Sequence, residues 1–156
     1  MDLQLTFRQA ASRDCSLLAE LNHQLIQDEG HRNPMTVPEL EKRMKEWLAG
    51  EYTAVIFEAE KLVVAYALFR EQPAEIYLRQ LFVVRERRRQ GIGRAAMEIL
   101  HSRVWPKTKR LTVEVLTSNA GAVAFWRAAG YSDYSLMLEI MPERKSQETL
   151  ASQSSG

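Results

Sequence analysis

In the middle of the chain a strand pattern, a helix pattern and a second strand pattern follow one another, and this order constrains the fold more than any other feature. Residues 76–84 and 111–116 have the composition and alternation of strands, whereas residues 91–104 carry apolar side chains at helical spacing until Pro106 ends the run. Two strands joined by a single helix lie parallel in a sheet. The sequence therefore predicts one parallel crossover.

The remaining segments predict a sheet that is otherwise antiparallel. Thr36 and Glu39 have the spacing of a capping box, which places the start of a helix there. The other predicted elements are a strand over 3–7, helices over 13–27 and 36–50, a hairpin over 52–57 and 62–69, a helix over 119–129 and a last strand over 131–140. We expect an α+β fold with a mixed, mostly antiparallel central sheet, as one domain over 1–142. Residues 143–156 are polar and are expected to form a disordered tail.

Composition excludes several classes of protein. The 21 lysines and arginines balance 20 aspartates and glutamates, so no global charge draws the chain to nucleic acid or to a membrane. The single cysteine, Cys15, excludes an internal disulfide, and no apolar run is long enough for a membrane span. His23, His31 and His101 are too scattered to predict a metal site. We expect a cytoplasmic protein with no metal.

The segment between the first strand of the crossover and its helix has the character of a phosphate-binding loop. It contains five arginines within residues 85–94, together with Gly91 and Gly93. A helix N-terminus leaves backbone N–H groups unpaired and favours an anion, and glycine allows a phosphate to approach the main chain. A solvated arginine-rich turn is the alternative, because the segment is short.

Two other phosphate-binding motifs fit the loop less well. Residues 91–96 match G-x-G-x-x-A, and Glu114 lies about 20 residues further on, as in a dinucleotide-binding fold. However, six residues separate the strand from the first glycine, and the repeated strand-helix units of that fold are missing. A P-loop is excluded because no Gly-Lys-Ser or Gly-Lys-Thr follows the glycines.

Two segments resemble the GNAT superfamily of acetyl-CoA-dependent N-acetyltransferases. Residues 88–93, Arg-Arg-Gln-Gly-Ile-Gly, resemble its Q/R-x-x-G-x-G/A signature, and residues 119–131 resemble its N-x-x-A-x-x-F-Y-x-x-x-G-F segment. The resemblance covers about residues 76–135. It implies a central sheet with helices on both faces, and transfer of an acetyl group from acetyl-CoA to a primary amine by direct attack in a ternary complex.

The resemblance also implies which residues bind acetyl-CoA. Backbone groups of a strand bind the pantetheine arm, the loop that follows wraps the pyrophosphate, and a later helix contacts the arm; the residues are Leu81, Phe82, Val83, Arg88, Arg89, Gln90, Gly91, Ile92, Gly93, Arg94, Asn119, Phe125 and Trp126. Asn119 is equally suited to be a helix N-cap.

The catalytic groups are less well defined by the sequence. Trp126 stands where the family often has a tyrosine that protonates the leaving thiolate, and an indole is a donor without useful acidity. Tyr131 and Tyr134 are nearby substitutes for that acid, and water is another. A base must deprotonate the amine, and Glu75 and Glu114 are the candidates.

The sequence does not identify the acceptor or the oligomeric state. The polar loop after the first helix, with Asp28, Glu29, His31 and Asn33, is expected to line an acceptor pocket for a small-molecule or peptide amine, and a solvated linker is the alternative. A non-catalytic acyl-CoA sensor and a nucleic-acid-binding module are competing functions. The final strand is compatible with pairing across a homodimer.

Overall fold

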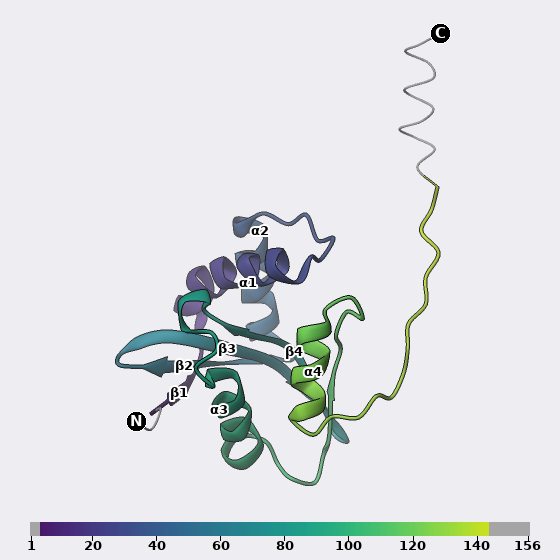
Figure 1. The fold of residues 1–156 in the computed structure, drawn as a ribbon. Coiled ribbons are helices and arrows are strands. Elements are labelled where there is room, and N and C mark those ends of the chain that lie inside the picture. The colour runs from purple at the N-terminus through teal and green to yellow at the C-terminus, as the bar shows by residue number, and fades with distance from the viewer. Residues whose placement is uncertain (1–3, 144–156) are drawn as a thin grey trace.

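The computed structural model describes residues 4–143, and within them five strands form one sheet in the order β1-β2-β3-β4-β5. The elements are β1 Thr6–Gln9, α1 Cys15–Glu29, α2 Val37–Ala49, β2 Tyr52–Ala59, β3 Leu62–Glu71, β4 Glu75–Val83, α3 Ile92–Ile99, β5 Arg110–Val113 and α4 Ala120–Ala128. Helices α1 and α2 lie on one face of the sheet, and α3 and α4 lie on the other (Figure 1). The predicted α+β fold is therefore confirmed.

The pairing of the strands follows the predicted pattern. Strands β1 to β4 pair antiparallel with their neighbours, and β4 pairs parallel with β5 through the α3 crossover. The hairpin between β2 and β3 turns at Glu60 and Lys61, whose φ angles of 54° and 68° suit a tight turn that follows the twist of the strands. The parallel crossover is confirmed.

The helices begin and end where the sequence indicated. Thr36 caps α2 by accepting from the Glu39 N–H, while the Glu39 carboxylate accepts from the Thr36 N–H at 3.0 Å, which is the predicted capping box. Gly30 ends α1 with a φ of 67°. Helix α3 continues as a π-turn over Leu100–Val104, where Trp105 N–H donates to the Leu100 carbonyl before Pro106 ends the run.

The core is divided by the sheet. One cluster packs under α1 and α2 and includes Leu18, Met44 and Tyr66, and the other packs under α3 and includes Phe57 and Leu100. All the buried apolar side chains of residues 4–143 lie between Cys15 and Trp105. Strand β5, helix α4 and the residues after them therefore cover the core only in part.

The C-terminal third departs from the sequence prediction. No strand forms over residues 131–140, which instead run away from the sheet in extended form (Figure 1). Strand β5 ends at Val113, short of the predicted Leu116. The tail predicted to be disordered lies, from residue 144 onward, outside the described residues. Within the part of the chain that is described, no helix is both long and apolar enough to span a membrane.

An ion-pair network joins the N-terminal strand to the first helix. Arg8 on β1 binds Asp14 through two hydrogen bonds of 2.9 and 3.0 Å and binds Glu58 on β2 at 2.9 Å. Asp14 is only 8% exposed and also accepts from the Ala11 N–H at 2.7 Å. The hydrogen bonds from Arg8 outweigh the effect of burial, so the pKa of Asp14 is lowered.

We predict that Asp14→Asn lowers the free energy of unfolding at pH 7 by about 1–3 kcal/mol, because a charge-assisted pair is lost at a buried site. Since the folded-state pKa is below the unfolded value of about 3.9, the stabilisation by Asp14 is present above that pH and is lost as pH falls further. Urea unfolding between pH 7 and pH 2 measures both effects. Glu98→Gln, which removes an exposed pair with Arg94 at 3.6 Å, is the control and should change stability little. An equal loss in both variants at pH 7 would contradict this assignment.

Candidate functional site

Strands β4 and β5 pair over a short stretch and then part. Their register runs from Glu75 opposite Arg110 to Leu78 opposite Val113, where β5 ends. Strand β4 continues to Val83, and no other strand within residues 4–143 pairs with this edge. The sheet therefore has an opening between the second half of β4 and the chain that leaves β5.

The backbone of β4 presents hydrogen-bonding groups to this opening. The Val84 N–H donates to the Val64 carbonyl on the β3 side at 2.9 Å. Because successive residues of a strand direct their backbone groups to opposite sides, those of Phe82 also face β3, and those of Leu81 and Val83 face the opening. The Val83 carbonyl accepts from the Arg88 side chain, so an extended ligand with amide groups can pair with both backbone groups of Leu81 and with the Val83 N–H.

A β-bulge interrupts β4 at the point where the opening begins. Leu68 on β3 is opposite Gln80 and Phe69 is opposite Leu78, so Arg79 has no partner in the ladder. The Tyr66 hydroxyl, which lies in the core under α1, donates to Gln80 at 2.8 Å. The bulge thus directs two consecutive side chains, those of Arg79 and Gln80, to the α1 and α2 side of the sheet.

The N-terminus of α3 lies beyond the end of β4 and supplies unpaired donors. Gly91 caps the helix with a φ of 79°, which glycine adopts without strain, and its carbonyl accepts from the Ala95 N–H at 3.0 Å. The N–H groups of residues 92–94 precede this bond and have no acceptor within the helix. The helix dipole adds partial positive charge, so an anion is favoured here.

Gly93 brings α3, α4 and β4 into close contact. A Cβ atom at Gly93 would lie 3.4 Å from the Phe125 ring and 3.7 Å from a Val83 methyl carbon. Gly93 therefore allows close packing of these elements, in addition to exposing its backbone N–H. Gly91 is required for a different reason, since a Cβ there would meet nothing within 4 Å and only its left-handed backbone matters.

Asp28 at the end of α1 holds the first part of the arginine-rich loop. It binds Arg85 at 2.8 Å and Arg88 at 2.6 Å. Arg88 also donates to the Val83 carbonyl at 3.0 Å and lies over the Phe82 ring. Burial acts to raise the pKa of Asp28, but the two arginines outweigh it and the pKa is lowered. Asp28, predicted for the acceptor pocket, thus anchors this loop.

The other arginines of the loop face solvent. Arg87 donates to Gln90 at 3.0 Å, Arg94 pairs with Glu98 at 3.6 Å, and Arg89 has a φ of 63°. All three side chains are near the free N–H groups of α3 in sequence and are not buried. The loop therefore combines backbone donors at the start of α3 with cationic side chains that are at least partly exposed.

A group of arginine and aromatic side chains lines the α1 and α2 side of the sheet beside the bulge. The Arg79 guanidinium lies 4.7 Å from the Trp47 ring centroid and donates to the Tyr52 hydroxyl at 3.2 Å. The Arg43 guanidinium lies 4.1 Å from the Trp47 ring centroid, and the Arg70 guanidinium lies over the Tyr52 ring. These residues were not predicted from the sequence, although an arginine inside the apolar strand β4 was a signal for one of them.

Glu114 and Tyr77 face each other where the strands part. Glu114 directly follows Val113 and is exposed, and Tyr77 is on the paired part of β4. Burial and then the charge of Glu114 raise the pKa of Tyr77. Of the two predicted bases, Glu114 is the one at the opening.

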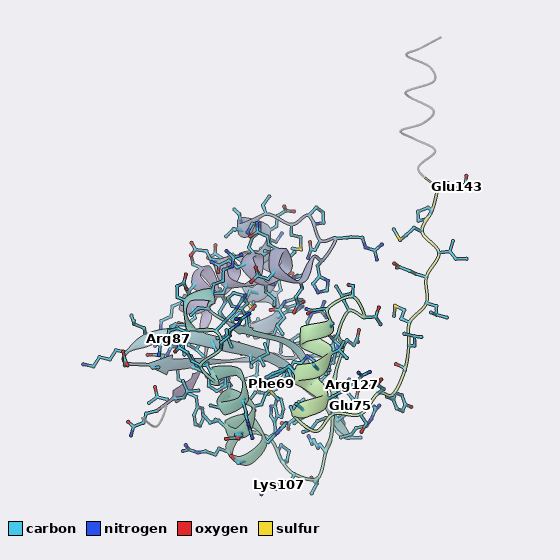
Figure 2. The ribbon with its side chains drawn as sticks, in the orientation of Figure 1. Phe69, Glu75, Arg87, Lys107, Arg127 and Glu143 are labelled. Carbon is cyan, nitrogen blue, oxygen red and sulfur yellow. The ribbon has the colours of Figure 1, made fainter. Side chains whose placement is uncertain are left out.

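The other two predicted catalytic residues, Glu75 and Tyr131, lie away from the opening. Glu75 begins β4 and binds Arg110 at 2.8 Å, and Figure 2 shows it far from Arg87, which follows the other end of the strand. Tyr131 follows α4 at the end distant from Asn119, packs against Trp126, and lies 3.4 Å from His101. Burial raises the pKa of Tyr131 to about 12. Neither side chain is placed at the opening.

The start of α4 borders the opening. The Asn119 side chain accepts from the Ala122 N–H at 3.1 Å and so caps the helix. Trp126 makes edge-to-face contacts with Phe125 and Tyr131, with centroid distances of 4.9 and 5.4 Å. Trp126 therefore packs within an aromatic row in the position where the family often has a tyrosine.

The remaining predicted acceptor residues make local contacts in the loop after α1. His31 Nε2 lies 2.7 Å from a Glu29 carboxylate oxygen, and Asn33 accepts from the Met35 N–H at 2.9 Å. The loop follows Asp28 and therefore lies near the arginine-rich loop. These hydrogen bonds are both within the loop itself.

Comparison with known proteins identifies the family. The model of the acetyltransferase (GNAT) family matches residues 18–131. No curated protein sequence matches the chain. The match spans both segments on which the predicted resemblance depends.

Solved structures of low sequence identity share the fold. A mutant of the BH1408 protein from Bacillus halodurans is 23% identical with a TM-score of 0.74, over 88% of this chain and 99% of that one. The aminoglycoside N-acetyltransferase AAC(6')-Iy in complex with CoA is 13% identical with a TM-score of 0.71, over 92% and 97%. A predicted acetyltransferase with acetyl-CoA from Clostridium acetobutylicum is 18% identical with a TM-score of 0.68, over 88% and 96%.

We predict that Gly93→Val lowers the free energy of unfolding by about 1–3 kcal/mol, because the added methyl groups overlap Phe125 and Val83. Gly121→Val is the matched control, since the nearest atom to a Cβ there, Asn119 Oδ1, is 4.0 Å away. Thermal unfolding followed by circular dichroism measures the difference. Equal melting temperatures for the two variants would show that the contact between α3 and α4 is not as close as described.

Proposed function

The chain belongs to the acetyltransferase (GNAT) family, and from this premise we propose that it transfers an acetyl group from acetyl-CoA to a primary amine by direct attack in a ternary complex. The observation that carries the proposal is the opening between β4 and β5, which combines free strand backbone with the free N–H groups of α3. Acetyl-CoA supplies the activated acetyl group.

The donor has chemistry that fits the opening. Its pantetheine arm contains amide groups, which both backbone groups of Leu81 and the Val83 N–H can pair with, whereas the backbone of Phe82 is engaged by β3 and the Val83 carbonyl by Arg88. Its pyrophosphate is an anion, which the N–H groups of residues 92–94 and the side chains of Arg89 and Arg94 would bind. Two structural neighbours contain CoA or acetyl-CoA, which supports this choice of ligand.

Glu114 is the proposed general base. An amine is a nucleophile only when it has lost its proton, and a carboxylate at the opening can accept that proton directly or through a water. Tyr77, beside it, keeps its proton because its pKa is raised, so it can donate a hydrogen bond to Glu114. Glu75 is excluded from this proposal by its position and its ion pair with Arg110.

The leaving thiolate takes its proton from water in this proposal. Trp126 cannot donate a proton as an acid, and Tyr131 is held in the aromatic row beside His101. The tryptophan at position 126, in place of the tyrosine common in the family, also favours the competing function, which is a non-catalytic acyl-CoA sensor. Turnover distinguishes the two.

The amine acceptor is proposed to enter on the α1 and α2 side of the sheet. Trp47, Tyr52 and Arg79 line that side next to the bulge, and Glu29 and His31 are on the loop near it. Aromatic faces and a guanidinium suit an acceptor with a planar or anionic group beside its amine. A structural neighbour, the aminoglycoside acetyltransferase meta-AAC0020, binds sisomicin, and this supports a small-molecule amine as the class to screen first.

We predict that acetyl-CoA at about 100 times its dissociation constant stabilises the protein by about 2.7 kcal/mol and raises Tm by about 5–10 °C. NAD and ATP are the controls and should give a smaller shift. Arg89→Glu should weaken acetyl-CoA binding by about tenfold or more through loss of a phosphate contact, whereas Arg13→Glu, far from the loop, should not. A shift that is equal for NAD would rule out the proposed donor.

We predict that Glu114→Gln lowers kcat/KM by about 10²–10⁴ with any amine that is turned over, and that part of the activity returns at high pH, where the amine loses its proton unaided. Acetylation of a panel of amines is measured from pH 6 to pH 10, with the released free thiol as the readout. Glu75→Gln is the matched control and should retain activity. A Glu114→Gln enzyme with an unchanged pH profile would remove Glu114 from the mechanism, and binding of acetyl-CoA without turnover of any amine would favour a sensor.

A further inference from the structure

Arginine and aromatic side chains alternate in one row across the α1 and α2 side of the sheet. The Arg43 and Arg79 guanidiniums lie 4.1 and 4.7 Å from the Trp47 ring centroid. Arg79 and Arg70 lie 5.8 and 5.6 Å from the Tyr52 ring centroid, and Arg70 is also 5.7 Å from that of Tyr77. The row, called here the arginine row, therefore consists in order of Arg43, Trp47, Arg79, Tyr52, Arg70 and Tyr77.

The positive charge of the arginine row is not balanced by nearby carboxylates. Arg43 donates to the Asn22 side-chain oxygen at 3.3 Å, and Arg79 donates to the Tyr52 hydroxyl at 3.2 Å, so both of these partners are neutral. Of the three arginines, Arg70 alone forms an ion pair within residues 4–143, at 3.7 Å from the exposed Glu51. Burial and then the charge of Arg79 lower the pKa of Arg43. A negative charge beside these guanidiniums would therefore be stabilising.

Buried hydrogen-bond donors at one end of the row lack acceptors. Asn22 on α1 has no exposed surface, and its Nδ2 has no hydrogen-bond partner within residues 4–143. The Nε atoms of Arg43 and Arg70 are likewise buried and without a partner in this part of the chain. Buried polar groups are normally paired, and an unpaired one costs free energy. The excess at this place is of donors, which favours a ligand with acceptor oxygens.

The other end of the row reaches the proposed general base. Burial and then the charge of Glu114 raise the pKa of Tyr77, whereas Arg79 acts in the opposite direction, so both charges lie near the Tyr77 ring. Tyr77 is opposite Thr112 in the ladder of β4 and β5, and the same register continued past Val113 brings Glu114 toward Arg79. An acceptor whose amine lies at Glu114 therefore extends toward the arginines.

We propose that the acceptor is an amine that also carries an oxyanion, a carboxylate or a phosphate, and that Arg43 and Arg79 bind this oxyanion while the amine lies at Glu114. The inference rests on the proposed acetyl transfer and adds the class of acceptor. A guanidinium fork matches two oxygens of either anion, and the Trp47 and Tyr52 rings hold the guanidiniums in place. Polycationic amines such as spermidine are repelled for the same reason and should be poor acceptors.

Two amines that differ in one charge test the proposal by turnover. The amines para-aminomethylbenzoate and para-aminomethylbenzamide share the ring and the amine, and the benzoate should have a kcat/KM about tenfold higher or more. Arg79→Gln should remove this preference by lowering kcat/KM for the benzoate alone, and Arg43→Gln, on another element, should do the same. Arg103→Gln is the matched control and should keep the preference, because Arg103 lies over the Phe7 ring on the α3 side of the sheet. Circular dichroism checks that the variants are folded.

Calorimetric titration without acetyl-CoA separates the anion site from the transfer reaction. Benzoate should bind to the wild type and to Arg103→Gln, and about tenfold more weakly to Arg79→Gln, whereas benzamide should show no such difference. Inorganic phosphate is the second probe. The N-terminus of α3 also suits phosphate, so only the binding that is lost in Arg79→Gln counts toward the arginine row. A larger loss for phosphate than for benzoate assigns a phosphorylated amine, and the reverse assigns a carboxylate.

The outcomes distinguish failure of this inference from failure of the proposed function. Benzoate binding that depends on Arg79, without turnover of any amine, supports the anion site and counts against acetyl transfer. Equal turnover of the two amines, with benzoate binding unchanged in Arg79→Gln, overturns the inference and leaves acetyl transfer in place. A lower melting temperature of Arg79→Gln with an unchanged ratio of the two kcat/KM values overturns it too, by showing that the row only stabilises the fold.

Discussion

The early end of the pairing between β4 and β5 is the constraint on which the rest of the site depends. Two parallel strands that stayed paired to Val83 would satisfy every backbone group and leave no room for a ligand. Because β5 stops at Val113, the N–H and carbonyl of Leu81 and the N–H of Val83 have no strand partner in the described chain, while the Val83 carbonyl accepts from Arg88. Such groups favour an extended ligand with amides, and the helix N-terminus just beyond favours a phosphate at one end of it. The strand backbone groups that favour amides and the helix N-terminus that favours a phosphate follow one another because a single crossover joins β4 to α3.

The bulge in β4 separates the proposed donor side of the site from the proposed acceptor side. Without an extra residue at Arg79, alternation would place Arg79 and Gln80 on opposite faces of the sheet. With it, both side chains lie on the α1 and α2 face, where Trp47 and Tyr52 accommodate the guanidinium. The α3 and α4 face keeps its apolar packing around Gly93 and Phe125. One inserted residue thus allows the two faces to carry different chemistry over the same short length of strand.

The sequence predicted most of the helices and strands well, and the candidate site only in part. Helix caps such as Thr36 with Glu39 and the strand-helix-strand order depend on local spacing, so they could be recognised without a structure. The ion pair of Glu75 with Arg110 could not, because it depends on the register between β4 and β5. The arginine and aromatic lining was also not predicted, since Arg43, Trp47 and Arg79 come from separate segments that only the fold brings together.

Residues 131–140 show the limit of such local patterns. Their alternation of apolar side chains is that of a strand, yet no strand forms over them in the described chain. A strand needs a neighbour that satisfies its backbone groups, and the spacing of side chains carries no information on whether an open edge lies within reach. The strand predicted there was therefore wrong, although the alternation that suggested it is present.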